Sequence, residues 1–138
     1  MLKTLFGWIF IIIAIVSCTA PVTIAGVKVD MAGGSYTNVT PAQLKEMLAK
    51  KDFQFINVHI PYEGEIAQTD AFVPYDKIEQ NLSKLPVDKN AKVFLYCRSG
   101  NMSTTAAAKL VKRGYTNIWH LPGGMVAWEQ AGLPLIRK

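Results

Sequence analysis

The stretch "VFLYCRSGNMSTTAAAKL", from Val93 to Leu110, decides how this chain is expected to fold. Its first four residues are apolar, which is typical of a strand buried on both faces. An alanine-rich helical pattern begins at Ser103 and ends at Gly114. Cys97 lies between the two patterns, so one of the two cysteines of the chain is expected where a strand turns into a helix.

Strand and helix patterns alternate along the rest of the chain. We expect strands at 36–39, 53–58, 71–75, 92–96 and 117–121, and helices that begin at Pro41 and Asp76 and span 103–113 and 123–131. Thr40 and Gln43 have the spacing of a helix-capping box. This alternation predicts the α/β class, with an open, mainly parallel five-stranded sheet and helices on both faces. Ligands bind such sheets beyond the carboxyl ends of the strands, where Cys97 is expected.

Composition excludes several classes of function. The chain has 138 residues, of which 50% are hydrophobic and 18% charged, and its net charge is +5. Basic residues form no run longer than a pair, so we expect no nucleic-acid partner. The sequence has no Cys-x-x-Cys, no Cys/His cluster with ligand spacing and no Gly-x-Gly-x-x-Gly. We therefore expect neither a metal site nor a dinucleotide site.

The first residues are typical of a secretory signal. "MLKTLFGWIFIIIAIVSC" carries one lysine, then an uncharged apolar run, and ends at Cys18. Its last four residues resemble a bacterial lipobox, which predicts a signal peptide at 1–17 and lipidation of Cys18. An uncleaved transmembrane anchor is the first alternative, because the 22 residues from Leu5 to Gly26 carry no charge. Cleavage at Ala20 is the second alternative. Each interpretation places the domain outside the cytoplasm, in the periplasm or at the cell surface.

The domain itself is expected to begin after a linker. Residues 18–35 are small or mixed in character, contain Pro21 and end near two glycines, so we interpret them as a linker. Residues 36–138 then form one domain, which we expect to be a monomer held at a membrane by its lipid anchor.

The loop after Cys97 has the composition of an anion-binding turn. The first turn of a helix has backbone N–H groups without partners, and the helix dipole favours negative charge there, so a thiolate is stabilised over a thiol. Gly100 supplies backbone freedom, and Arg98 adds a positive charge. We therefore predict that Cys97 is a nucleophile whose adduct is held by N–H groups. The residues alone leave open whether phosphorus, arsenic or sulfur is attacked, and a structural cysteine is the alternative.

Three motifs together resemble the rhodanese family of single-domain sulfurtransferases. They are "CRSGNMS" (97–103), "HLPGGMVAWEQAGLPL" (120–135) and "INVHIPYEGEI" (56–66). The resemblance implies that Cys97 takes a sulfane sulfur from a thiosulfate- or polysulfide-type donor and becomes a persulfide, without a cofactor. The acceptor would be cyanide or the thiol of a partner protein. The implied substrate-binding residues are Arg98, Ser99, Gly100, Asn101, Met102 and Ser103. Cysteine-dependent phosphatases require Cys-x5-Arg, and Ser103 occupies the arginine position here.

Several positions depart from the family pattern. Many relatives have Asp and Arg where this chain has Asn57 and His59, and Arg or Lys where it has Met102. We expect Asn57, His59 and Glu63 to border the pocket, and His120 to be structural. Because the loop has no second cation, the sequence gives less support for the dianion thiosulfate as the donor. The alternative function is a non-catalytic rhodanese-fold binding module at the cell envelope.

Overall fold

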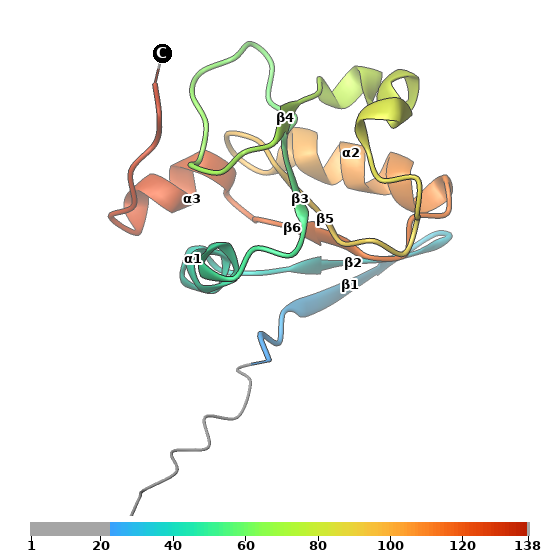
Figure 1. Ribbon diagram of the computed structural model, residues 1–138, viewed down its shortest axis with the longest axis horizontal. Coiled ribbons are helices and arrows are strands. Elements are labelled where there is room, and N and C mark those ends of the chain that lie inside the picture. Colours follow the sequence, from blue (N-terminus) through green and yellow to red (C-terminus); the bar gives the residue numbers. More distant parts are fainter. Residues whose placement is uncertain (1–22, 138) are drawn as a thin grey trace, which may run out of the picture.

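A computed structural model describes residues 23–137 as an α/β fold (Figure 1). The predicted signal peptide and the lipidation site at Cys18 lie outside the described residues. The sheet has six strands in the order β1 (Val27–Met31), β2 (Gly34–Asn38), β6 (Ile118–His120), β5 (Val93–Tyr96), β3 (Gln54–Asn57) and β4 (Ala71–Phe72). Every neighbouring pair is parallel except β1 and β2. The expected α/β class and its mainly parallel sheet are confirmed.

The strand β1 corrects two expectations. Within the expected linker, residues 27–31 form β1, which pairs antiparallel with β2 as a hairpin, and the sheet therefore has six strands instead of five. The apolar Val27, Val29 and Met31 alternate with charged residues, which is a strand signal, but the adjacent glycines are equally typical of linkers. The strand β1 lies at the edge of the sheet, and its apolar residue Val27 is 69% exposed. Its alternating pattern therefore does not correspond to a buried face.

Helices cover both faces of the sheet, as expected. The segments are α1 (Pro41–Ala49), the 3-10 helix η1 (Tyr75–Lys84), α2 (Asn101–Lys112) and α3 (Gly124–Gln130). One core cluster joins the sheet to α2 and η1, and a second joins it to α1 and α3, which lie on the opposite face (Figure 1). This places α2 and α3 on either side of the strand end that carries Cys97.

The capping box of α1 is confirmed, whereas the helix expected from Asp76 differs in kind. Gln43 N donates to Thr40 Oγ1 at 3.2 Å, and Thr40 N donates to Gln43 Oε1 at 2.8 Å. The later segment is a 3-10 helix broken at Asn81, whose backbone is not helical. The Asn81 side chain donates to the Lys77 carbonyl at 2.8 Å and so competes with regular helical hydrogen bonding.

The strand β5 is buried along its whole length. Phe94 packs among α1 and α3, and Leu95 packs among α2 and η1 on the other face. Burial of each such side chain contributes about 1.5–3 kcal/mol to folding. The residue that follows this strand is therefore held at a fixed position.

Four polar or reactive residues lie at the carboxyl edge of the sheet. Asn38, Asn57 and His120 end the strands β2, β3 and β6, and Cys97 follows β5 directly. Asn38 lies opposite His120 in the register of β2 and β6. Between residues 23 and 137, no helix is both long and apolar enough to cross a membrane.

Candidate active site

Cys97 lies directly after β5 and is 1% exposed. Its Sγ accepts a hydrogen bond from Gly100 N at 3.0 Å and lies 3.3 Å from Ser103 Oγ. Gly100 caps α2 in the left-handed conformation, with φ of 103°, which a side chain would disfavour. The chain thus turns back on itself within three residues and brings the start of α2 to the sulfur.

The first turn of α2 presents hydrogen-bond donors beside Cys97. The N–H of Thr104 bonds to the Gly100 carbonyl at 3.0 Å and begins the helical pattern. The N–H groups of Asn101, Met102 and Ser103 precede that bond and have no intrahelical acceptor. Negative charge on Cys97 therefore meets the positive end of the α2 dipole.

The helix α3 fixes the other side of the loop. Met125 N donates to the Cys97 carbonyl at 2.9 Å, and Val126 N donates to the Arg98 carbonyl at 3.0 Å. Gly124 makes this approach possible, because a Cβ at this position would collide with the Cys97 carbonyl oxygen. The N–H groups in the first turn of α3 have no acceptor within that helix, and they thus hold the backbone around Cys97.

Ser103 connects Cys97 to a buried histidine. Its Oγ lies 2.8 Å from His120 Nε2, and His120 Nδ1 lies 2.8 Å from Asn38 Oδ1. Burial lowers the pKa of His120 to about 4, so the imidazole is neutral at neutral pH. Sequence reasoning treated His120 as structural and did not include Asn38. The signal that brings them to the site is that they end two neighbouring parallel strands, β2 and β6, of which β6 lies next to β5.

Arg98 points toward a carboxylate. Its guanidinium is 59% exposed, and Nη1 lies 3.5 Å from Glu63 Oε2. His59 Nε2 hydrogen-bonds to the same carboxylate. The bond from His59, together with the positive charge of Arg98, lowers the pKa of Glu63. Glu63 is therefore ionised at neutral pH and opposes the charge of Arg98.

Asn57 and His59 anchor the loop between β3 and β4. Asn57 Oδ1 accepts from His59 N at 3.0 Å, and Asn57 Nδ2 donates to the Gly64 carbonyl at 3.0 Å. Both side chains are buried. Where many relatives carry Asp and Arg, Asn57 thus holds the loop by hydrogen bonds to its backbone.

The loop residues expected to bind substrate divide into three groups. Gly100 and Ser103 contact the sulfur of Cys97. Arg98, Ser99 and Asn101 are exposed around it. Met102 is half-buried and packs against the core on the α2 face. Their contact with a substrate stays a prediction.

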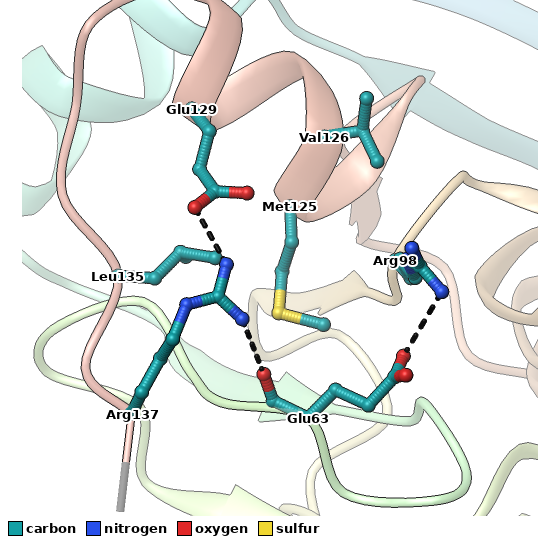
Figure 2. A pocket seen from close by; sticks show the side chains of 7 residues that line it. All are labelled: Glu63, Arg98, Met125, Val126, Glu129, Leu135 and Arg137. Carbon is teal, nitrogen blue, oxygen red and sulfur yellow. Dashed lines mark hydrogen bonds and ion pairs between the residues drawn. The ribbon is translucent and has the colours of Figure 1, made fainter.

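A pocket of about 120 Å³ adjoins this loop (Figure 2). Its lining residues are Glu63, Arg98, Met125, Val126, Glu129, Leu135 and Arg137. Figure 2 shows Arg137 between two partners: it donates to the Glu63 carbonyl at 3.1 Å and to Glu129 Oε1 at 2.6 Å. The Cys97 side chain is not part of the lining. The pocket therefore lies beside the buried sulfur, on the side of Arg98.

Sequence reasoning expected Glu63 and Arg98 near the site but missed the residues supplied by the carboxyl end. Glu65 and Ile136 exchange two backbone hydrogen bonds, at 2.9 and 2.8 Å, which bring the final segment against the loop. A single isolated bridge of this kind has no periodic sequence signal. It follows that Arg137 could be placed only from the structure.

Comparisons with known proteins agree on one family. The model of the rhodanese-like domain matches residues 40–131. The chain is 38% identical over 112 residues to an uncharacterized protein of Synechocystis sp., covering 78% of this chain and 61% of that protein. It is 37% identical over 90 residues to a protein of Allochromatium vinosum named sulfurtransferase, covering 62% of this chain and 80% of that protein.

A solved structure also resembles this fold. The crystal structure of a rhodanese-related protein from Thermoplasma volcanium superposes with a TM-score of 0.62 at 27% identity. It covers 73% of this chain and 98% of that protein. The family match, residues 40–131, contains the strands β3 to β6 and the loop that carries Cys97.

Proposed function

This chain belongs to the rhodanese-like domain family, and from that premise we propose that it is a sulfurtransferase in which Cys97 carries the transferred sulfur. Membership and a relative named sulfurtransferase support a sulfurtransferase-like role. The observation that carries the assignment to Cys97 is its position: Sγ lies 3.0 Å from Gly100 N at the start of α2. A helix N-terminus favours the thiolate that such chemistry requires.

The reaction proceeds in two transfers. The Cys97 thiolate attacks the sulfane sulfur of the donor, a new sulfur–sulfur bond forms, and the leaving group departs with the electron pair of the broken bond. For thiosulfate that leaving group is sulfite. A nucleophile, either cyanide or a thiolate of an acceptor protein, then attacks the outer sulfur of the Cys97 persulfide. The electron pair of that bond returns to Cys97, so the cycle needs no oxidant or reductant.

The loop from Arg98 to Ser103 supplies the binding site for the transferred sulfur. Gly100 N holds the inner sulfur, and the N–H groups at the start of α2 stabilise negative charge on the outer one. Donors that are fixed in place before the reaction stabilise developing charge without reorganising.

The donor is proposed to carry little negative charge. Arg98 is paired with the ionised Glu63, and Met102 adds no charge to the loop. The attraction for a dianion is weakened by this pairing. Organic polysulfides, which carry no charge on the sulfur chain, are therefore favoured over the dianion thiosulfate.

Mass spectrometry tests the proposal directly. The purified chain is incubated with thiosulfate or with polysulfide, and the gain of one sulfur atom on the peptide containing Cys97 is measured. Cys97→Ser is the matched control and gains no sulfur at this position. A folded protein whose Cys97 acquires sulfur from neither donor would overturn the proposal and favour the alternative, a non-catalytic binding module. The neutralised Arg98 is the observation that favours that alternative.

The place of action is a separate proposal. The lipobox-like residues before Cys18 support export, lipidation of Cys18 and attachment of a monomeric domain to a membrane on the periplasmic or outer side. Metabolic labelling with a fatty acid tests it, with Cys18→Ser as control. Loss of the label and release of the Cys18→Ser chain from membranes is the expected result. Membrane retention of that variant would favour the transmembrane anchor.

A further inference from the structure

A continuous chain of side-chain contacts leads from the reactive sulfur into the core. Cys97 Sγ, Ser103 Oγ, the His120 imidazole and Asn38 Oδ1 follow one another at 3.3, 2.8 and 2.8 Å. The three inner members come from α2, β6 and β2, and Ser103 and His120 are buried. The two-transfer scheme above gives no task to His120 or to Asn38.

We propose that His120 acts on Cys97 through Ser103, as a positioning residue that orients the Ser103 hydroxyl and takes up the thiol proton during attack. This inference rests on the sulfurtransferase function proposed above and adds the fate of the proton to it. Ser103 is in direct contact with the reacting sulfur, whereas His120 and Asn38 act through it.

The hydrogen-bond partners determine which atom donates its hydrogen at each contact between Cys97 and Asn38. An amide oxygen only accepts, so the contact with Asn38 Oδ1 assigns the hydrogen of His120 to Nδ1. His120 Nε2 then holds a lone pair and accepts from the Ser103 hydroxyl. Ser103 Oγ is placed to donate to Cys97 Sγ at 3.3 Å, but it has a single hydrogen. When that hydrogen is directed to His120 instead, a lone pair of Ser103 Oγ faces the Cys97 thiol. The Gly100 carbonyl, 3.1 Å from Ser103 Oγ, is the competing acceptor.

The surroundings keep His120 neutral and ready to accept. Its pKa is lowered by burial, so the lone pair is present throughout the neutral range. The titratable side chains brought to it by contacts among residues 23–137 are Cys97, through Ser103, and Tyr36, whose ring packs edge-on at 5.7 Å. No carboxylate is among these contacts. The imidazolium therefore forms beside a negative sulfur and not in the resting state.

The proton transfer balances within the site. The S–H bond breaks and its proton passes to Ser103 Oγ, while the original Ser103 hydrogen passes to His120 Nε2. The electron pair left on Cys97 forms the bond to the sulfane sulfur. The resulting imidazolium lies beside a persulfide anion, and the proton returns along the same path when the acceptor removes the outer sulfur and Cys97 leaves as a thiolate.

A proton path of this kind has a distinct pH signature. When the thiol proton is transferred internally, the rate depends on neutral His120 and neutral thiol together, so it is level from just above the pKa of His120 into the neutral range. Without the path, only the thiolate that is already present reacts, so the rate rises with pH. A merely structural histidine would not change the shape of this profile.

The reaction of Cys97 with methyl methanethiosulfonate, an uncharged sulfur electrophile, measures this profile without a physiological donor. The rate is followed by peptide mass analysis from about pH 5 to about pH 8, so that labelling at Cys18 is resolved from labelling at Cys97. We expect a level rate in the full chain. His120→Gln retains an acceptor for Ser103 but no base, and we expect its rate at about pH 5 to fall about a hundredfold and to rise with pH.

Two further variants keep the test decisive if His120→Gln unfolds, which circular dichroism reveals. Ser103→Ala interrupts the path and should give the same rising profile, with no additional loss in the double variant. Asn38→Asp places a carboxylate beside His120 Nδ1, which favours the protonated imidazole. The pH below which the rate begins to fall should therefore be higher in this variant. A folded His120→Gln or Ser103→Ala chain with a level profile would overturn the inference. A chain that shows the expected profiles but gains no sulfur from thiosulfate or polysulfide would instead overturn the proposed function.

Discussion

The amide nitrogen of Met125 lies 2.9 Å from the carbonyl oxygen of Cys97, so the first turn of α3 holds the backbone of the proposed nucleophile. The thiol itself faces the other way, toward the start of α2. The position of Cys97 thus depends on two helices from opposite faces of the sheet, and several consequences of this arrangement are measurable.

Replacement of Gly124 by alanine should displace the active loop. A Cβ on Gly124 collides with the Cys97 carbonyl, and φ at this position is +52°. We expect Gly124→Ala to lose most of its sulfur transfer and about 2 kcal/mol or more of unfolding free energy. Gly132→Ala is the matched control, because φ is +78° there but no atom lies within 4 Å of the added Cβ. It should lose about 1 kcal/mol and no activity, and equal activity of the two variants would contradict the role of Gly124.

Removal of the Tyr96 hydroxyl should weaken the loop between β3 and β4. This hydroxyl accepts from Ile66 N at 3.0 Å and lies 2.7 Å from Thr69 Oγ1, and burial raises the pKa of Tyr96 to about 12. Tyr96→Phe leaves the Ile66 N–H buried without that partner, which costs about 1–3 kcal/mol in denaturant unfolding.

Tyr115→Phe is the control for that measurement. Its hydroxyl makes a longer bond, 3.4 Å, to the Pro86 carbonyl, so we expect a loss below about 1 kcal/mol. Equal losses in Tyr96→Phe and Tyr115→Phe would show that the bond to Ile66 has no special weight.

Acid should destabilise the folded chain through His120. Its pKa is about 4 when folded and 6.5 when unfolded, so the unfolded chain binds the proton first as pH falls. The contribution is complete above pH 6.5 and is lost as pH falls toward 4, and it amounts to about 2 kcal/mol between about pH 7 and pH 5. Denaturant unfolding at both pH values should show this loss in the full chain. His120→Gln should lack it, and an equal loss in that variant would assign the effect to other groups.

A cation in the loop should change the donor preference. Met102→Arg adds a charge at the start of α2 that Glu63 does not already neutralise. We expect kcat/KM for thiosulfate to rise about tenfold relative to an uncharged thiosulfonate, and the gain to shrink in high salt. Met102→Leu preserves the apolar contact and should leave the ratio of the two donors unchanged. A gain that is equal for both donors would argue against an electrostatic cause.

Much of the fold follows from patterns within single segments. The buried run before Cys97 and the capping residues of α1 predicted β5 and α1 within a residue or two, because burial and capping are local properties. The hairpin at 27–38 was missed because its outer strand is exposed and its turn glycines resemble a linker. The helix expected from Asp76 is a 3-10 helix, and its kind could not be predicted because the break depends on one side-chain bond of Asn81.

The candidate site was predictable only where one loop supplies it. The strand, cysteine and helix start are consecutive, so their contact follows from sequence order. The chain from Ser103 through His120 to Asn38 joins residues as far as 82 positions apart, and it depends on the order in which strands lie in the sheet. The same is true of Arg137, which reaches Glu63 from 74 positions away.

The return of the carboxyl end to the pocket affects how the protein should be prepared for assay. Arg137 lines the pocket and bonds to Glu63 and Glu129. A purification tag joined directly after Arg137 would therefore begin at the rim of the site and compete with incoming donors or acceptor proteins. A tag placed in the β1–β2 turn at Ala32–Gly33, at the opposite end of the sheet from the reactive cysteine, avoids that interference.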